Sequence, residues 1–185
     1  ATFAIAAYLF HFALVGLGLH WIFAVAVAAT SAVVFGVLLD RFMYAPIQRH
    51  EGSFFTVFVA SFGIGIVVQN LLGSVFGRGF MSVPTPLSNS VEVVPGLYLS
   101  PLNGLAIMCA IACFAALHFF LTRTFVGKGL RALSENPELV RTFGLSPRRL
   151  STYAFALGSL LVVPGAIFTA AGTGINPAVG HHVML

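Results

Sequence analysis

The chain has 185 residues, of which 58% are hydrophobic and only 8% are charged, and its formal net charge at pH 7 is +4. With a mean hydropathy of +0.99, it has too few polar side chains to cover the surface of a soluble globule, so the composition indicates an integral membrane protein. Its basic residues alternate with long apolar runs instead of lining a face with aromatic residues, which argues against binding to nucleic acid.

Five apolar segments reach or approach the length of about 20 helical residues that the hydrocarbon core of a bilayer requires. None of them contains Asp, Glu, Lys or Arg. We expect helices, because lipid offers no partners for the backbone of isolated strands and no period-2 alternation is present. The predicted fold class is an all-α, polytopic membrane protein with about five spans, at residues 1–17, 18–39, 53–76, 99–121 and 150–172.

The first segment is the shortest, and Gly16 and Gly18 offer a turn before His20 and Trp21. The chain lacks an initiating Met and a basic region typical of a signal peptide, and it begins and ends in apolar sequence. We therefore expect residues 1–185 to form a single membrane domain that is part of a longer protein.

Basic residues predict the orientation of the spans, because they concentrate on the cytoplasmic side. Arg41 and Arg49 lie in the second interval between spans, and six more basic residues lie in the fourth, within residues 122–150. Only Arg78 lies in the interval 77–98. With eight of nine basic residues on one side, we expect that side to be cytoplasmic and 77–98, an irregular ordered connection, to face outside with the tail after 172.

The third predicted span carries polar and glycine residues. Gln69 and Asn70 lie deep within it, and an amide in hydrocarbon is costly unless it is hydrogen-bonded, so we expect both to face the protein interior. Two interpretations stay open: hydrogen bonds between helices, which we favour, or a translocation path. Four glycines share this span: Gly63, Gly65, Gly73 and Gly77. Gly73 and Gly77 have the spacing of close helix packing, while Gly63 and Gly65 would line the path in the second interpretation.

No metal or catalytic site is predicted. Cys109 and Cys113, four residues apart in an apolar run, are expected to be small buried hydrophobes. The adjacent His181 and His182 cannot enclose a metal by themselves. An enzyme in the membrane would need a nucleophile beside a base, and no spacing pairs the serines at 61 and 159 with His118.

The spans hold no charged residue with which to couple transport to protons or sodium, and the chain contains no Walker A motif. If the protein moves a solute uphill, the energy must come from another subunit. A kink candidate, Pro164–Gly165, lies in the last span.

The long polar interval 122–150 marks out a short helix. Asn136 is suited to cap it, Pro137 to its first position, and Glu138 to the positive end of its dipole. Gly144 is expected to end the helix, and Ser146 with Pro147 to begin the next span. A two-turn helix is not stable alone, so it must dock against its own membrane domain or another protein.

This interval carries a family resemblance. The sequence GKGLRALSENPELVRTFGLSPRRL closely resembles the cytoplasmic coupling loop of permease subunits of branched-chain amino-acid ABC importers, and the matching positions are Gly127, Lys128, Arg131, Ala132, Glu135, Asn136, Pro137 and Gly144. The segment ASFGIGIVVQNLLGSVFG, the loop RFMYAPIQRHEGS with Arg41, Tyr44 and Pro46, and INPAVG are similar to other family motifs in the same order. The departures, Val140, Ala45 and Gly129, are changes in packing.

The resemblance implies a permease subunit in the bacterial cytoplasmic (inner) membrane, surrounded by lipid. It implies a second homologous permease, two ATP-binding subunits and an extracytoplasmic solute-binding protein as partners. ATP is used by the partners, so this chain is expected to bind no cofactor and to have no enzymatic activity. The helix 136–143 would couple the ATPases to the spans, and the residues expected to act there are Lys128, Arg131, Glu135, Asn136, Pro137, Glu138 and Gly144.

The resemblance also implies that an initial helix and two or three terminal spans lie outside this chain. Branched-chain or other hydrophobic amino acids are the expected solutes, with urea or short amides as the alternative within the family. A stand-alone channel or carrier is the alternative outside it, and it leaves the short polar helix without a partner. The sequence does not distinguish a pairing of identical permeases from a pairing of two different ones.

Overall fold

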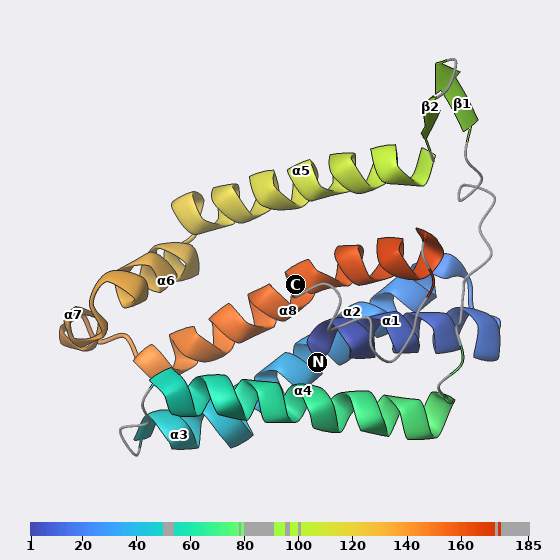
Figure 1. Ribbon diagram of the computed structural model, residues 1–185. Coiled ribbons are helices and arrows are strands. Elements are labelled where there is room, and N and C mark those ends of the chain that lie inside the picture. Colours follow the sequence, from blue (N-terminus) through green and yellow to red (C-terminus); the bar gives the residue numbers. More distant parts are fainter. Residues whose placement is uncertain are drawn as a thin grey trace.

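The computed structural model describes residues 1–49, 54–77, 79, 91–94, 97–99, 101–172 and 174 (Figure 1). The first part of the chain forms α1 (Thr2–His11), the π-helical turn η1 (Phe12–Gly16), α2 (Trp21–Leu39), a second π-helical turn η2 (Asp40–Tyr44), α3 (Ala45–Arg49) and α4 (Phe54–Phe76). The second part forms strands β1 (Val91–Val94) and β2 (Leu97–Leu99), then α5 (Pro101–Arg123), α6 (Phe125–Glu135), α7 (Pro137–Thr142) and α8 (Pro147–Gly172).

Within the described residues, four helices are long and apolar enough to cross a membrane, and their spans are Trp21–Ile47, Phe55–Phe76, Pro101–Arg123 and Pro147–Gly172. The first predicted segment forms a shorter apolar helix, Thr2–Gly16. The predicted fold class, a polytopic α-helical membrane protein, is therefore confirmed. Most bounds agree with the sequence prediction within a few residues, because long apolar runs bounded by polar ones fix where a helix can lie in lipid. The exception is the span predicted at 18–39, whose helix continues through η2 and α3 to Ile47.

The helices α1, α2 and α8 pack together as the core of the bundle (Figure 1). Every fourth residue on one face of α2 is small and fully buried: Ala24, Ala28, Ala32 and Gly36. Small side chains let helix backbones approach closely, which is how packing stabilises helices in a bilayer where lipid is as apolar as the protein. A contact of small residues was predicted on the third span, whereas the small face of α2 was not predicted.

The helix α2 approaches α8 closely at Gly36. A Cβ on this residue would collide with the Ser159 side chain and would lie 3.2 Å from the Phe155 carbonyl oxygen. We expect Gly36→Ala to lower the stability of the purified protein by about 1–3 kcal/mol, the usual cost of overpacking. The measurement is the midpoint of thermal unfolding in detergent.

Gly158→Ala is the matched control for that substitution. A Cβ at Gly158, on α8, meets nothing within 4 Å, and alanine in a helix interior is favoured over glycine. A Gly36→Ala protein that is as stable as the Gly158→Ala protein would contradict the close crossing of α2 and α8.

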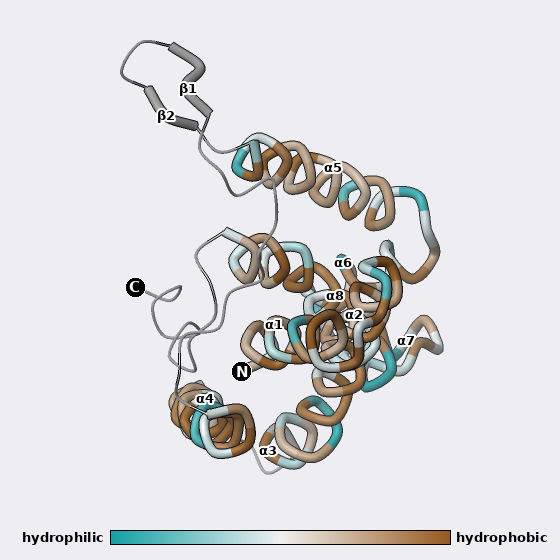
Figure 2. The backbone as a smooth tube through the Cα atoms, turned by 90° about the vertical axis from the view of Figure 1, so that its right-hand side faces the viewer, coloured by the Kyte–Doolittle hydropathy of each residue, from teal (hydrophilic) through white to brown (hydrophobic). Residues whose placement is uncertain are grey.

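The helices α4 and α5 lie on opposite flanks of this core, and both are coloured mostly as hydrophobic (Figure 2). Leu102 is the buried residue of α5, and Val68 is buried on α4. Large side chains such as Phe58 on α4 and Phe114 on α5 are exposed. Such faces are suited to contact lipid or further transmembrane helices.

Between α4 and α5 the chain forms a small antiparallel hairpin of β1 and β2. Its pairs are Val91↔Leu99, Glu92↔Tyr98 and Val94↔Leu97, with an irregularity between Glu92 and Val94. These strands were not predicted, because the interval 77–98 was expected to be an irregular connection. Arg78, the INPAVG motif, His181 and His182 lie outside the described residues.

Candidate coupling site at the basic end of the bundle

The interval 122–150 folds as two helices and a turn, which join α5 to α8 at the end of the bundle opposite the hairpin (Figure 1). The chain leaves α5 at Thr124, whose hydroxyl accepts a hydrogen bond from the Gly127 N–H at 3.0 Å and donates one to the Phe120 carbonyl at 2.7 Å. This side chain caps α6 and joins it to α5. A Cβ on Gly127 would lie 2.6 Å from the Cα of Leu121, so only glycine permits this tight junction.

The helix α6 was not predicted from the sequence. Its signals were present, since Thr124 is a good cap and apolar residues follow at helical spacing. The polar residues of α6, including Lys128, Arg131 and Glu135, are exposed, whereas Gly127 and Gly129 are buried. The helix is therefore amphipathic, and its buried side faces the ends of the spans.

The predicted short helix is present as α7, and it ends as expected at Gly144. Gly144 has φ +75°, a conformation that glycine adopts readily. Its N–H donates to the Arg141 carbonyl at 3.0 Å, and the Leu145 N–H donates to the Val140 carbonyl at 3.2 Å. This pair of bonds is the Schellman motif that closes many helices.

The bounds of α7 are one residue shorter at each end than the predicted 136–143. Asn136 has φ −154° and ψ 106°, which is extended backbone, and its carbonyl accepts from the Val140 N–H at 3.4 Å. It therefore stands before the helix, as the predicted cap does, and separates α7 from α6. The side chains of Pro137 and Glu138 lie outside the described part of the structure.

One face of α7 docks against the chain itself. Val140 is only 1% exposed, which places it among the most completely buried large side chains of the described residues. Arg141 and Phe143 remain exposed, and 77% of Phe143 is open. A large apolar side chain at the most polar end of the protein, beside an arginine, has the character of a binding anchor.

The start of α8 is tied to the end of α2 by a buried carboxylate. Asp40, in η2, is 3% exposed and accepts hydrogen bonds from the Ser151 hydroxyl at 3.0 Å and the Thr152 hydroxyl at 2.6 Å. A buried carboxylate requires such partners, and hydrogen bonds to a charged group are the strong ones. We call this arrangement the Asp40 latch.

Asp40, which directly follows an apolar run, was not predicted from the sequence as a functional residue. The local signal is a π-helical turn, which is rare and often marks a functional position, but such a turn is not readable from sequence. Nearby, Tyr44 donates to or accepts from the Ser61 hydroxyl at 2.6 Å, and its ring stacks on Phe155 at 4.9 Å. The turn η2 therefore contacts both α4 and α8.

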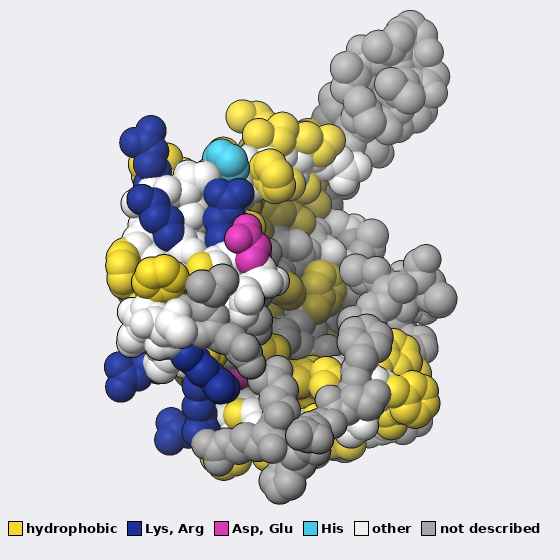
Figure 3. Space-filling view, turned by 90° about the vertical axis from the view of Figure 1, so that its left-hand side faces the viewer, with side chains coloured by type: hydrophobic (Ala, Val, Ile, Leu, Met, Phe, Trp, Pro, Cys, Tyr) yellow, Lys and Arg dark blue, Asp and Glu magenta, His cyan; other side chains and the backbone are white. Residues whose placement is uncertain are grey.

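The basic residues gather at this end (Figure 3). Exposed arginine and lysine side chains come from both predicted cytoplasmic intervals: Arg41, Arg123, Lys128, Arg131, Arg141, Arg148 and Arg149. This placement agrees with the prediction that the two basic intervals lie on one side of the membrane domain. The hairpin, from the interval predicted to face the other side, lies at the far end of the bundle (Figure 1).

The predicted path residues lie on α4, but they do not share one face of this helix. A Cβ on Gly63 or Gly65 would meet nothing within 4 Å, so the described helices do not pack there. Gln69 is half-buried, and exposed Asn70 donates from Nδ2 to the Ile66 carbonyl of its own helix at 2.9 Å. The packing role expected for Gly77 is wrong, because it ends α4 with φ +85°.

Other candidate groups do not come together in the described part of the chain. His118 is exposed on α5, Ser61 is bonded to Tyr44, and Ser159 is buried beside Gly36. No group of three His, Cys, Asp or Glu suited to a metal ion is found among the described residues. The two cysteines of α5 are half-buried free thiols, less enclosed than expected.

The fold and this end of the bundle define a polytopic α-helical membrane protein whose spans are joined to a capped, basic segment outside the bilayer. The chain belongs to the family described as branched-chain amino acid transport system / permease component, whose sequence model matches residues 1–185. The resemblance noted in the sequence is thereby confirmed.

A curated relative supports the same family. The chain is 23% identical over 163 residues to the high-affinity branched-chain amino acid transport system permease protein BraD of Pseudomonas aeruginosa. The match covers 85% of this chain and 52% of BraD, so the chain spans about half the length of this relative. No solved structure shows a significant match to the chain.

Proposed function

We propose that this chain is part of the transmembrane permease of an ATP-driven importer for branched-chain or other hydrophobic amino acids in the bacterial cytoplasmic membrane. Two ATP-binding subunits, a second homologous permease and an extracytoplasmic solute-binding protein would complete the importer. ATP would be hydrolysed by the partners, and this chain would bind no cofactor. The observation that carries the proposal is the continuous connection from the exposed face of α7 to the core of the bundle.

That connection has three steps. Val140 fixes α7 to its own chain, and the Gly144 motif leads from α7 directly into α8. The Asp40 latch then ties the first turns of α8 to α2. Since α2 and α8 pack together in the core, a rigid-body push on α7 would reach the spans without being absorbed by a loose linker.

The proposed coupling surface surrounds α7. Five exposed residues would contact the ATP-binding subunits. Three lie on α6, at Lys128, Arg131 and Glu135, and the other two are Arg141 and Phe143. Asn136 and Gly144 would act by shaping the helix, because one caps its start and the other closes its end. Pro137 and Glu138 belong to the proposed surface on the sequence resemblance.

We place the translocation path beside α4, at Gly63, Gly65, Gln69 and Asn70. Its support is that a Cβ on Gly63 or Gly65 would meet nothing within 4 Å and that Asn70 is exposed, in an apolar span that carries two amides. We expect Gln69→Leu to lower the rate of uptake about two- to tenfold, the effect of losing one net hydrogen bond. Ser74→Ala is the control, since Ser74 bonds the Leu71 carbonyl of its own helix. Equal uptake by the two variants would remove Gln69 from the path.

The experiment that tests the function is uptake of labelled leucine and labelled urea by cells lacking their own importer and carrying the full-length protein with its partners. We expect ATP-dependent leucine uptake. Uptake of urea alone would move the substrate to the alternative within the family. Uptake that continues without ATP would favour a stand-alone carrier or channel and contradict the proposal.

A further inference from the structure

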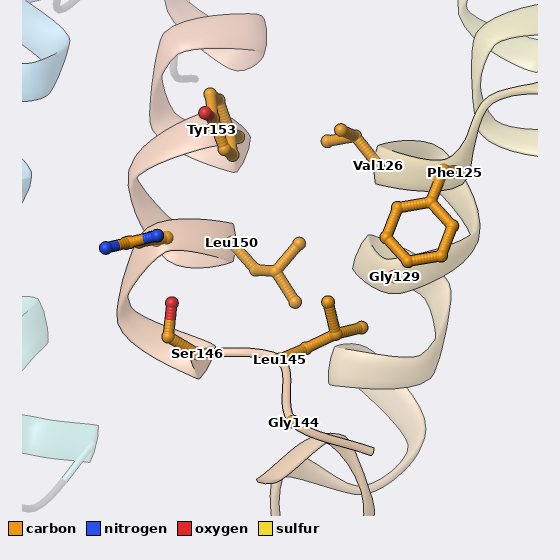
Figure 4. A pocket seen from close by; sticks show the side chains of 9 residues that line it. Phe125, Val126, Gly129, Gly144, Leu145, Ser146, Leu150 and Tyr153 are labelled. Atoms are coloured by element: carbon orange, nitrogen blue, oxygen red, sulfur yellow. The ribbon is translucent and has the colours of Figure 1, made fainter.

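A cavity of about 470 Å³ lies between α6 and α8 at the basic end of the bundle (Figure 4). Phe125 and Val126 line it from α6, and Leu150 and Tyr153 line it from α8. Arg149 is the charged residue of its wall. The space is thus apolar with one cationic group, and its size is that of a small-molecule site.

No residue lines both this cavity and the next space along α8. A second space of about 400 Å³ lies between α2, α5 and α8, and its wall is formed by apolar residues, among them Ala116 and Phe120 of α5 and Leu157 and Leu161 of α8. Residues four apart lie on one face of a helix. One face of α8 therefore begins at Arg149 and runs through Tyr153, Leu157 and Leu161, and we call the space along it the α5–α8 groove.

The mouth of this groove is strongly basic. On the other flank of Arg149, a third cavity of about 250 Å³ is lined by Arg41, Arg148 and Arg149 together with Asp40. Three arginines and one aspartate therefore line this cavity, and the aspartate already accepts hydrogen bonds from two hydroxyls. The excess positive charge favours an anion at this position.

We propose that the α5–α8 groove binds an anionic phospholipid. The phosphate would lie at Arg148 and Arg149, and one acyl chain would run along Tyr153, Leu157 and Leu161. A basic mouth at the end of the spans, leading into an apolar groove within them, matches a molecule with a charged head and a long apolar tail. A soluble protein fits less well, because the second space lies wholly between transmembrane helices.

The bound lipid would fill the gap between α6 and α8, the two helices that flank α7. Anionic lipid would then stabilise the position of the coupling surface. This inference goes beyond the proposed function, because lipid binding is measured without solute, ATP or partner subunits.

The test is native mass spectrometry of the full-length protein in mild detergent with phosphatidylglycerol or phosphatidylcholine. We expect wild-type protein to retain phosphatidylglycerol in preference to phosphatidylcholine. Arg149→Gln should weaken that retention about fivefold, the usual effect of one basic residue near an anionic lipid. Arg131→Gln is the matched control, since Arg131 is also exposed but lines none of the three cavities.

A second variant tests the groove itself without changing charge. Ala116 is exposed on α5 and lines the groove, so Ala116→Trp should fill the space of the acyl chain and release the lipid. Equal retention of the two lipids by wild type, or equal losses in the two arginine variants, would overturn the proposal. Loss of a co-purified protein from Ala116→Trp with lipid retention intact would show that a protein occupies the groove instead.

Discussion

Solute uptake is expected to stop when residues 135–144 are deleted, while insertion of the protein into the membrane continues. The deletion removes α7 and its closing turn, which lie outside the spans, so the apolar segments that direct insertion are intact. The measurement is uptake of labelled leucine together with the amount of protein in isolated membranes. Normal uptake by the inserted deletion protein would show that α7 does not transmit motion.

A single substitution gives a sharper form of this test. Phe143→Ala should reduce co-purification of the ATP-binding subunits about thirtyfold, because truncating a buried aromatic anchor costs about 2 kcal/mol or more. Phe114→Ala is the control, since Phe114 is 74% exposed on α5 and Phe143 is 77% exposed beside α7. Similar losses in both variants would mean that the effect arises from general destabilisation.

The second large effect is expected at the Asp40 latch. Asp40→Ala removes the acceptor of the Ser151 hydroxyl and leaves the Thr152 hydroxyl with only the Arg148 carbonyl, at 3.1 Å. Each hydrogen bond to a charged group contributes about 1.5–3 kcal/mol. We expect a clear fall in the thermal midpoint in detergent and strongly reduced uptake. Asp40→Asn keeps one carbonyl acceptor and should lose less.

A double-mutant cycle separates the latch from a general effect of the substitution. Asp40→Ala and Thr152→Val each remove the shorter of the two bonds, so their combination should cost less than the sum of the single changes. Additive losses would mean that the two side chains do not interact. Control substitutions at exposed Thr30, whose hydroxyl bonds its own helix, should change neither quantity.

The spans could be predicted from the sequence because membrane-length apolar runs have one structural solution in lipid. Pro147 and Gly144 were likewise predictable, since one is suited to begin a helix and the other to adopt the positive φ that ends one. These are local properties of the chain. They do not depend on which distant segments come together.

The features that were missed depend on distant contacts. Asp40 meets residues 111 and 112 positions further along the chain, so its role is invisible in its own neighbourhood. The small face of α2 with Gly36 becomes a packing surface only when Ser159 of α8 lies against it. Gly77 is the opposite case. Its spacing from Gly73 is typical of close helix packing, but Gly77 adopts a positive φ and ends its helix.

The central claim is that α7 couples this permease to ATP-binding subunits, and one measurement tests it most directly. The full-length tagged protein is purified from its host in mild detergent, and the bound proteins are identified and counted by mass spectrometry. We predict recovery of two ATP-binding subunits with a second permease. Recovery of the folded protein alone, under conditions that keep known importers intact, would contradict the coupling role of α7 and favour a stand-alone carrier or channel.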